Sequence, residues 1–357
     1  IVGYFRVEEY LNQPIHPVRA EHDSDRYLFE VQSGQTLKVV VGNLKKQDLI
    51  SDAKRIYWLG RLMGVQRKLK AAEYEISPAM SVRELLLLLS SGRGVERKVV
   101  IPEGHNIFEI SEIFEREQLM KKEEFLRYVS QPEIVEQYLG ESLPSLEGYL
   151  FPSTYHFFKG TKGEDVIRLM VQKFFKEYKG IEGFVKKMGW TRHQVVTLAS
   201  IIEKETGAPW ERGLISSVFH NRLQKKMKLQ TDPTILYAKA LMSGVYELSI
   251  SRSDLSLVHP YNTYQISGLP PGPIGNPGAA ALRAAVQPEP SNFLYFVSRN
   301  DGTHVFSVTY QEHLKAVRVY QLDSKMREGR SWRDLKERFR ELETPSDQKD
   351  EPQQQQN

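Results

Sequence analysis

Short runs of β-branched and aromatic residues alternate with short amphipathic stretches in the first third of the chain, and this alternation most constrains the fold. Residues 29–34 read as a strand that ends in a glycine turn, and apolar residues then recur at helical spacing up to residue 49. About seventy residues later, residues 99–104 lead in the same way into a helical pattern that reaches residue 119. This weak internal repeat of strand, turn and helix predicts an α+β fold built from small modules.

The segment between the two repeats contains a further strand and helix. Residues 73–78 read as a strand and turn, and Ser81 with Glu84 forms the capping signature of a leucine-rich helix that ends at Gly92. In shape these modules resemble LysM-type carbohydrate-binding modules. A purely structural α+β domain is the alternative.

Composition limits the classes of protein to which the chain can belong. Its 357 residues suit two or three domains, and 40% apolar with 26% charged residues excludes a polytopic membrane protein and a wholly disordered chain. The absence of cysteine excludes disulfides, zinc–thiolate sites, iron–sulfur clusters and cysteine nucleophiles. A net charge of +4 and the lack of a Walker or GxGxxG loop indicate neither a nucleic acid nor a nucleotide as partner. A pI near 8.9 nevertheless suits a polyanionic surface or polymer.

Both ends of the sequence differ from its middle. The chain begins with isoleucine rather than methionine, so we expect an upstream segment, and residues 1–28 are expected to be membrane-proximal. Residues 1–5 are apolar but too few to span a bilayer, and they fit either the end of an anchor or an ordinary first strand. Residues 344–357 are polar and glutamine-rich, which predicts a disordered tail. An amphipathic helix is expected before the tail, from Trp332, Leu335, Phe339 and Leu342.

From about residue 147 the pattern changes to longer helices and loops. Residues 147–155 read as an aromatic turn, and we expect the boundary between the two regions to lie between residues 138 and 147. Periodicity and turn residues predict helices over 166–178, 191–206 and 212–224, a Gly- and Pro-rich loop over 261–277, and strands over 292–297 and 303–308. Asn300-Asp301-Gly302 joins these strands as a hairpin-type turn.

The helix predicted over residues 191–206 carries the most informative side chains. Thr191 and Gln194 form a capping box, and the apolar positions that follow define one buried face: Val195, Leu198, Ala199 and Ile202. Glu205 projects at one edge of that face and Glu203 at the other, whereas Lys204 is expected to point to solvent. Hydrocarbon and the negative end of the helix both raise the pKa of Glu205, as a general acid for a glycosidic oxygen requires. An ordinary ion pair with a nearby Lys or Arg is the alternative.

Two polar segments indicate a carbohydrate ligand. Residues 229–234 place three polar side chains at a turn, and residues 261–274 combine amides, hydroxyls and two tyrosines on a proline-stiffened loop. Tyrosine rings stack on sugar faces, and side-chain amides pair with sugar hydroxyls and N-acetyl groups. A structural loop over a core is the alternative.

Together with the strand at 294–297 and His304, these segments resemble the MltG (YceG-like) family of endolytic murein transglycosylases. The resemblance runs from about residue 29 to residue 320 and rests on long motifs in the right order: Ala199–Thr206, Leu229–Thr234 and Tyr261–Ile274. It implies LysM-like N-terminal α/β modules over 29–140, which bind peptidoglycan, and a lysozyme-related mixed α/β catalytic domain over 141–343. It also implies a single N-terminal anchor in the bacterial cytoplasmic (inner) membrane, with the catalytic domain extracytoplasmic or periplasmic.

The resemblance further implies a lytic transglycosylase, a carbon–oxygen lyase that cuts MurNAc–GlcNAc bonds inside nascent glycan strands and thereby ends their elongation. On the motif, the catalytic glutamate falls at Glu205, and Thr206 takes the place of the serine in the Glu-Ser pair of other lytic transglycosylases. Glu205 would protonate the glycosidic oxygen and then remove the proton of the muramic C6 hydroxyl, which leaves a 1,6-anhydro end. Asp232 is expected to position the substrate or orient Glu205.

The remaining candidates for the glycan groove are polar and aromatic residues of the shared motifs and of the turn at 147–149. They are Gln230, Thr231, Tyr237, Tyr261, Asn262 and Tyr264, with Glu147 and Tyr149. The expected partners are peptidoglycan strands, peptidoglycan synthases or divisome and elongasome proteins, and the membrane through the anchor. No cofactor and no nucleic acid are expected.

Two other functions stay open at this point. The chain is then either a non-catalytic peptidoglycan scaffold with Glu205 in an ion pair, or a hydrolase that uses Asp232 with Glu205 and leaves a reducing end. A metal site built from His259, His304 and His313 is not supported, because no HExxH or comparable spacing is present. We therefore expect no metal.

Overall fold

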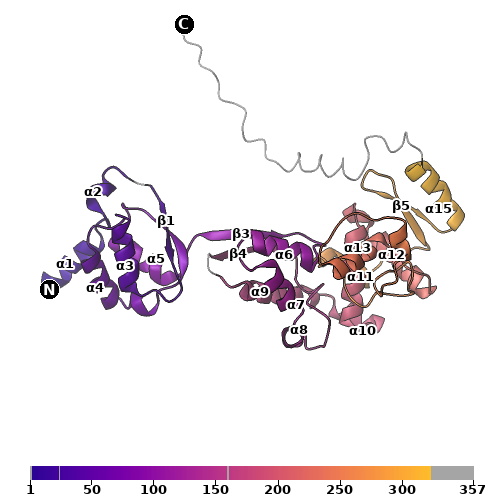
Figure 1. Ribbon diagram of the computed structural model, residues 1–357, viewed down its shortest axis with the longest axis horizontal. Coiled ribbons are helices and arrows are strands. Elements are labelled where there is room, and N and C mark those ends of the chain that lie inside the picture. The colour runs from indigo at the N-terminus through magenta and orange to yellow at the C-terminus, as the bar shows by residue number, and fades with distance from the viewer. Residues whose placement is uncertain (1, 24, 159–160, 323–357) are drawn as a thin grey trace, which may run out of the picture. The chain divides into compact units, whose positions relative to one another are not determined.

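The computed structural model describes residues 2–23, 25–158 and 161–322, with side chains described from residue 6 onward. The chain forms two compact units that interleave along the sequence (Figure 1). The N-terminal unit comprises Ile1–Ile101, Ser111–Arg127 and Ser153–Leu169, and the C-terminal unit comprises Pro102–Ile110, Tyr128–Pro152 and Met170–Asn357. These units are defined by compactness, so the functional domain limits of 29–140 and 141–343 stay predictions.

One hydrophobic core joins the first elements of the N-terminal unit, except that α2 contributes no buried residue to it. These elements are α1 (Val2–Leu11), α2 (Pro17–Ala20), β1 (Tyr27–Val31), α3 (Leu37–Lys46), α4 (Ala53–Leu62), η1 (Val65–Arg67), β2 (Ala72–Ile76) and α5 (Val82–Ser91). Strands β1 and β2 pair antiparallel, with Tyr27 opposite Ile76. Alternate residues of each strand enter the core, among them Phe29 and Tyr74. The strand, helix and turn predicted here from residue 29 to Gly92 are confirmed.

A second antiparallel pair completes the N-terminal unit. β3 (Glu96–Ile101) pairs with β4 (Ser153–Phe158), with Ile101 opposite Ser153. Between these strands in sequence lie α6 (Ile107–Arg116), α7 (Lys122–Val129) and α8 (Pro132–Leu139), and α9 (Gly163–Tyr178) follows β4. The prediction of a turn up to residue 155 is wrong at its end, because Tyr155 and Phe157 alternate into the core as part of β4.

The C-terminal unit is mainly helical. Its elements are α10 (Glu182–Met188), α11 (Arg192–Glu205), η2 (Pro209–Glu211), α12 (Arg212–Gln224), α13 (Asp232–Ser243), η3 (Ser253–Ser256), α14 (Ala279–Val286), β5 (Tyr295–Ser298), β6 (His304–Ser307), α15 (Tyr310–Val317) and η4 (Arg318–Leu322). β5 and β6 form the predicted hairpin, with Ser298 opposite His304. Helix α13 was not predicted, since residues 229–234 indicate only a turn.

Helix α11 lies at the centre of the C-terminal unit and packs against α12, α13 and α14. Thr191 and Gln194 form the predicted capping box. The sequence predicts a single buried face, but every residue from 195 to 202 is buried. Two polar residues are accommodated there because Thr197 donates to the His193 carbonyl (2.7 Å) and Ser200 donates to the Thr197 carbonyl (2.8 Å).

The described residues confirm the α+β class, since they combine many helices with three two-stranded antiparallel sheets. The LysM-like character of the N-terminal modules stays a prediction. The alternative prediction of a first strand at residues 1–5 is wrong, because Val2–Leu11 is helical, and Val7, Tyr10 and Leu11 follow helical spacing. Within the described residues, no helix has the length and apolar character needed to cross a membrane. The predicted tail at 344–357 and the helix before it lie outside the described residues.

We predict that Ser81→Ala destabilises the protein by about 1 kcal/mol, because α5 loses its N-terminal side-chain cap. The Ser81 hydroxyl accepts from the Glu84 amide (3.1 Å), and the Glu84 carboxylate accepts from the Ser81 amide (2.7 Å). Thermal and urea denaturation followed by circular dichroism measure the change. Ser90→Ala is the matched control, because its hydroxyl bonds only within the helix. Equal effects of both substitutions would contradict the capping argument.

Candidate active site

Helix α11 ends at Glu205, whose half-buried side chain lines a groove of about 460 Å³ in the C-terminal unit. The rest of the lining comes from α12, the loop before α13, the start of α13, the proline-rich loop at 261–277, β5 and α15. The lining residues are Glu205, Arg222, Leu229, Gln230, Asp232, Tyr264, Tyr295, Phe296, Val297, Tyr310, His313 and Val317. The groove therefore combines carboxylates and one guanidinium with several aromatic rings, which suits a polar ligand with flat apolar faces.

The carboxyl group of Glu205 is poised between its two protonation states. Burial raises its pKa to about 7, and the negative charge of Asp232 acts in the same direction. The hydrogen bond donated by the Thr231 hydroxyl and the positive charge of Arg222 favour the ionised form and oppose this rise. The predicted rise in the pKa of Glu205 is thus present, and burial is its main cause.

Thr231 is held rigidly beside Glu205. It is 2% exposed, and its amide donates to the Thr263 hydroxyl at 3.1 Å. The Gln230 amide donates to the Thr263 carbonyl at 3.2 Å, and Gln230 has a φ of +53°, a left-handed conformation that non-glycine residues rarely adopt. Thr263 therefore clamps the turn that delivers the Thr231 hydroxyl to the carboxylate.

Asp232 is the first residue of α13 and lies on the exposed side of the groove. The Tyr264 hydroxyl donates to its Oδ1 atom at 2.7 Å, which links the proline-rich loop to the start of α13. The structure thus brings together four predicted residues around Glu205: Gln230, Thr231, Asp232 and Tyr264.

Glu203 is held in a different environment from Glu205. Its side chain is 7% exposed, pairs with Arg212 at 3.2 Å and accepts from the Gly278 amide at 2.9 Å. Both oxygens of Glu203 therefore have structural partners. Lys204 does not point to solvent as predicted: its ammonium group donates to Glu109 at 3.1 Å and lies 4.8 Å from the Tyr246 ring centroid. Glu109 lies on α6 and Tyr246 in the segment after α13, and sequence periodicity does not reveal contacts between such distant segments.

The other predicted groove residues do not line the groove. Tyr149 and Asn262 are fully buried; the Tyr149 hydroxyl bonds His193 at 3.0 Å, and the Asn262 amide donates to the carbonyls of Leu255 and Leu257. Tyr261 is half-buried and lies 5.1 Å from the ring of Tyr237, which is 2% exposed. These side chains organise the loop that carries Tyr264.

Glu147 is also buried away from the groove lining. It is 3% exposed and accepts from the Ile107 amide (3.0 Å) and from the Asn276 side chain (2.9 Å). Burial raises the pKa of Glu147 to about 7, while its hydrogen bond with Tyr237 favours ionisation. This carboxyl group therefore joins the start of α6, the proline-rich loop and α13.

Sequence reasoning missed Arg222, which lines the groove from α12. Arg222 is 8% exposed, donates to the carbonyls of Leu294 (2.6 Å) and Leu229 (2.7 Å), and lies 5.2 Å from the Tyr295 ring centroid. An arginine within a predicted apolar helix segment was the available signal. The aromatic lining from β5 and α15 was also missed, including the Tyr295–His313 stack at 5.2 Å.

The histidines considered as metal ligands serve other contacts. His304 bonds the Glu211 carboxylate through its ring (2.8 Å) and its amide (3.0 Å). His313 lies in the groove lining, and the His259 ring bonds the Tyr261 amide. Among the described residues, no group of three or more His, Asp or Glu side chains is placed to hold a metal ion.

Comparison with known proteins identifies the family. Residues 29–319 match the model of the YceG-like family. The chain belongs to this family. An endolytic murein transglycosylase of Bacillus subtilis (strain 168) is 32% identical over 337 residues, covering 90% of this chain and 91% of that protein. An endolytic murein transglycosylase of Streptococcus pneumoniae serotype 2 is 28% identical, over 87% of this chain and 60% of that protein.

Among solved structures, the crystal structure of a putative YceG-like protein from Listeria monocytogenes is similar to this chain. The two share 34% sequence identity with a TM-score of 0.57, over 82% of this chain and 98% of that one. The resemblance inferred from the motifs is therefore confirmed. This YceG-like protein carries Glu205 at the end of its central helix.

We predict that two groove substitutions shift the pKa of Glu205 in opposite directions. Thr231→Val removes a hydrogen bond to the ionised carboxylate and raises this pKa, whereas Asp232→Asn removes a negative charge and lowers it. Infrared or carbon NMR titration of the carboxyl groups, with Glu205→Gln to assign the signal, measures both shifts. Glu136→Gln, an exposed change on α8, should leave the pKa unaltered. Shifts of the same sign in the two variants would refute this electrostatic account.

Proposed function

We propose that this chain is an endolytic murein transglycosylase with Glu205 as its catalytic acid and base. Its family membership supports the activity, and the carboxyl group of Glu205 in the groove supports the catalytic role. A single group must first donate a proton to the glycosidic oxygen and then accept one from a hydroxyl. A pKa of about 7 suits both steps near neutral pH.

The environment of Glu205 accounts for each half of this cycle. Burial and Asp232 favour the protonated acid, which donates to the oxygen between MurNAc and GlcNAc as that bond breaks. Arg222 and the Thr231 hydroxyl stabilise the carboxylate that remains. The carboxylate then takes the proton of the muramic C6 hydroxyl, while the C6 oxygen forms its bond to C1. The product has a 1,6-anhydro end, and no water is consumed.

The groove residues have separate roles in this proposal. Tyr264, Tyr295 and Tyr310 offer ring faces to sugars, and Gln230 and Asp232 offer polar groups at the exposed side. Thr231 orients the carboxyl group of Glu205. Tyr237, Tyr261, Asn262, Glu147 and Tyr149 hold the loops that carry these groups, rather than contacting the glycan themselves.

Family membership does not favour the two alternative functions, a hydrolase or a non-catalytic peptidoglycan scaffold. In the hydrolase alternative, Asp232 acts with Glu205, and the product has a reducing muramic end. In the scaffold alternative, Glu205 is an ordinary paired carboxylate. Its partner in the structure is the Thr231 hydroxyl, and its pKa is raised, whereas an ion pair with Lys or Arg would lower it.

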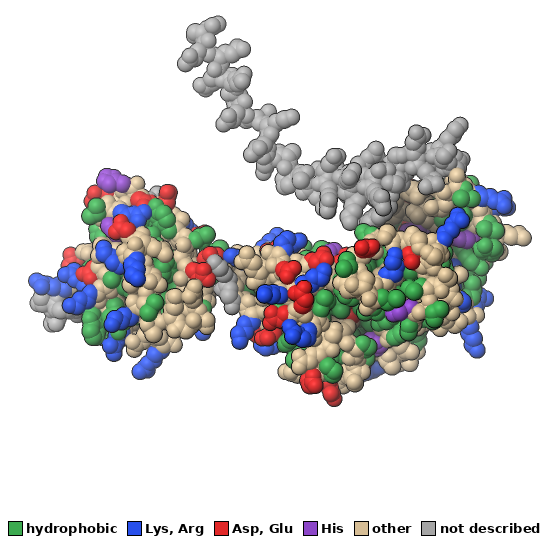
Figure 2. All heavy atoms as spheres, in the orientation of Figure 1, with side chains coloured by type: hydrophobic (Ala, Val, Ile, Leu, Met, Phe, Trp, Pro, Cys, Tyr) green, Lys and Arg blue, Asp and Glu red, His purple; other side chains and the backbone are tan. Residues whose placement is uncertain are grey.

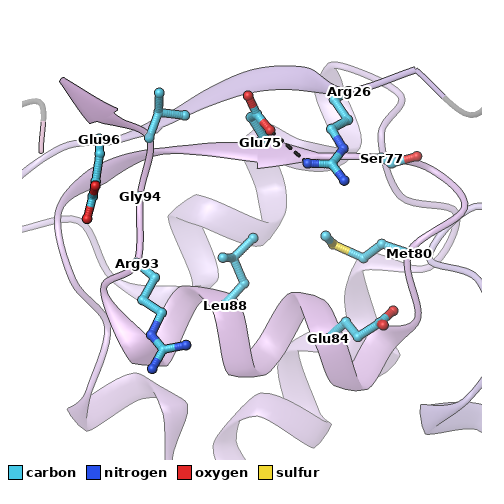
Figure 3. Close-up of a pocket in the computed structure, with 10 residues that line it drawn as sticks. Arg26, Glu75, Ser77, Met80, Glu84, Leu88, Arg93, Gly94 and Glu96 are labelled. Atoms are coloured by element: carbon cyan, nitrogen blue, oxygen red, sulfur yellow. Dashed lines mark hydrogen bonds and ion pairs between the residues drawn. The ribbon is translucent and has the colours of Figure 1, made fainter. Parts of the chain in front are cut away.

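For the N-terminal region over 29–140, we propose LysM-like binding of peptidoglycan. A hollow of about 640 Å³ in the N-terminal unit supports this role (Figure 3). Met80 and Leu88 point into the space between β2 and α5, and the Arg26–Glu75 ion pair (3.0 Å) lies at its border (Figure 3). Apolar side chains beside charged groups suit a sugar ring with its hydroxyls.

The location and partners are also part of the proposal. A cell-wall enzyme of this kind acts outside the cytoplasmic membrane, and an upstream N-terminal anchor would hold it there. Cutting nascent strands internally would end their elongation. Peptidoglycan synthases and the divisome or elongasome are the partners that such an activity would serve.

We predict that Glu205→Gln lowers the rate of cleavage by about 10³-fold, because the glycosidic oxygen loses its proton donor. The substrate is uncrosslinked peptidoglycan strands, and mass spectrometry identifies the new ends. Internal anhydro-muramic ends are expected from the wild type. Glu203→Gln is the matched control: it weakens the buried pair with Arg212 and lowers thermal stability, but cleavage continues.

Other outcomes of this experiment would contradict particular parts of the proposal. Loss of cleavage in a folded Glu203→Gln protein alone would move the catalytic acid by two positions. Reducing ends would make the enzyme a hydrolase and give Asp232 a catalytic role. Strand binding without cleavage by the wild type would support the scaffold.

We predict that kcat/KM falls by about tenfold for each pH unit above a pH of about 7, because Glu205 must be protonated to act. In Asp232→Asn the pKa of Glu205 is lower, so the decline begins at lower pH. The measurement is the pH dependence of kcat/KM for both proteins. If kcat/KM begins to fall at the same pH in both proteins, the titration of Glu205 is not the cause of the decline.

A further inference from the structure

One helix face in the N-terminal unit has no part in the proposed reaction. The exposed positions of α4 are Lys54, Arg55, Trp58, Arg61 and Leu62. They are spaced i, i+1, i+4, i+7 and i+8, so they form a single stripe along the helix. These five residues are called the α4 stripe.

Packing fixes the direction in which the α4 stripe faces. Ile56 and Gly60 are the buried positions of α4, and a Cβ at Gly60 would lie 2.7 Å from a methyl group of Leu37. The helix therefore packs closely on the core and cannot turn the stripe inward. As a result, Trp58 is 54% exposed and Leu62 is 78% exposed. Two large apolar side chains exposed one helical turn apart, beside three cations, indicate an interaction site.

The surroundings of the α4 stripe are cationic and aromatic. The Arg61 guanidinium lies 5.3 Å from the Trp58 ring centroid, and the Arg55 guanidinium lies 5.4 Å from that of Tyr10 on α1. A hollow of about 620 Å³ adjoins the stripe between α1 and α4, lined by Arg6, Val7, Tyr10, Asp52, Lys54, Arg55, Trp58 and Leu59. Figure 2 shows Lys and Arg side chains gathered at the end of the N-terminal unit where α1 and α4 lie.

The charges in this region favour an anionic partner. Asp52 is the acidic residue that lines the hollow, and it pairs with Arg55 at 3.3 Å. The α4 stripe contains three cations and no acid. Basic groups are attracted to anionic lipid headgroups, tryptophan prefers the membrane–water interface, and an exposed leucine gains by entering the acyl region. A glycan is a poorer match, because the stripe has no amide or hydroxyl side chain to pair with sugar hydroxyls.

We propose that the α4 stripe, with the adjoining hollow, binds the surface of an anionic lipid bilayer. Lys54, Arg55 and Arg61 contact lipid phosphates, while Trp58 and Leu62 enter the boundary between headgroups and acyl chains. This contact is peripheral, since the stripe lies on the face of a short helix. It does not rest on the proposed catalytic function.

The test is sedimentation of the 357-residue chain with lipid vesicles. Vesicles of phosphatidylcholine with phosphatidylglycerol should bind the protein, and the binding should weaken as salt is added. Vesicles of phosphatidylcholine alone should bind it far less. Replacing Lys54, Arg55 and Arg61 by Ala should weaken binding on the order of 100-fold, at roughly fivefold for each cation.

Two further variants test the apolar part of the stripe. Leu62→Ser changes a side chain that is 78% exposed, so the fold should persist while vesicle binding weakens. Brominated lipids should quench the fluorescence of Trp58, and Trp58→Phe should lose that quenching. Trp210→Ala, at another exposed tryptophan (74%), is the matched control and should retain it. Lys186→Ala with Lys187→Ala is the charge control on exposed positions of α10.

The proposal is overturned if the wild type does not bind anionic vesicles. It is also overturned if the α10 control weakens binding as much as the α4 variants, because net charge would then explain the effect. Uncrosslinked peptidoglycan strands provide the competing ligand. The stripe binds an anionic polymer instead of a membrane if two results occur together. The wild type binds these strands but not anionic vesicles, and the α4 variants lose binding to the strands.

Discussion

The burial of α11 on all sides is the constraint on which the C-terminal unit depends. A helix that is buried all round must be enclosed, so α12, α13 and α14 pack against it. Its charged groups lie at its ends, and the two polar residues in its middle, Thr197 and Ser200, donate to carbonyls of the same helix. Glu205 is the last residue of this helix, where the enclosing layer opens into the groove. A carboxyl group at such a place is desolvated by the core, which raises its pKa, and it still lines a groove that a ligand can enter.

The turn between α12 and α13 balances that desolvation. Thr263 holds Gln230 and Thr231 in place, so the Thr231 hydroxyl faces Glu205 without further ordering. Arg222 donates hydrogen bonds to backbone carbonyls of the same region, and its positive charge lowers the pKa of Glu205. Because these polar groups are already in place, little free energy is spent on reorganising them when the carboxyl group loses or gains its proton. Glu203, two residues earlier, is instead paired with Arg212 and accepts from the Gly278 amide.

The two units present surfaces of different character. In the C-terminal unit the aromatic lining of β5 and α15 faces the groove beside Glu205. In the N-terminal unit the small core fixes α4 so that cations and a tryptophan face outward. Each surface follows from a packing requirement elsewhere: the enclosure of α11 in one unit, and the close approach of Gly60 to Leu37 in the other.

Part of the local structure could be predicted from the sequence alone. Capping residues and periodicity predicted α5, α11 and the β5–β6 hairpin, because caps and turns depend on neighbours a few residues apart. The motifs also singled out Glu205, Thr231, Asp232 and Tyr264. Only the tertiary structure decided between Glu205 and Glu203 as a groove residue, added Arg222, and buried Tyr237, Asn262, Glu147 and Tyr149. Those outcomes depend on contacts between segments far apart in the chain, such as Glu147 with Asn276 and Arg222 with Leu294, and no local pattern records them.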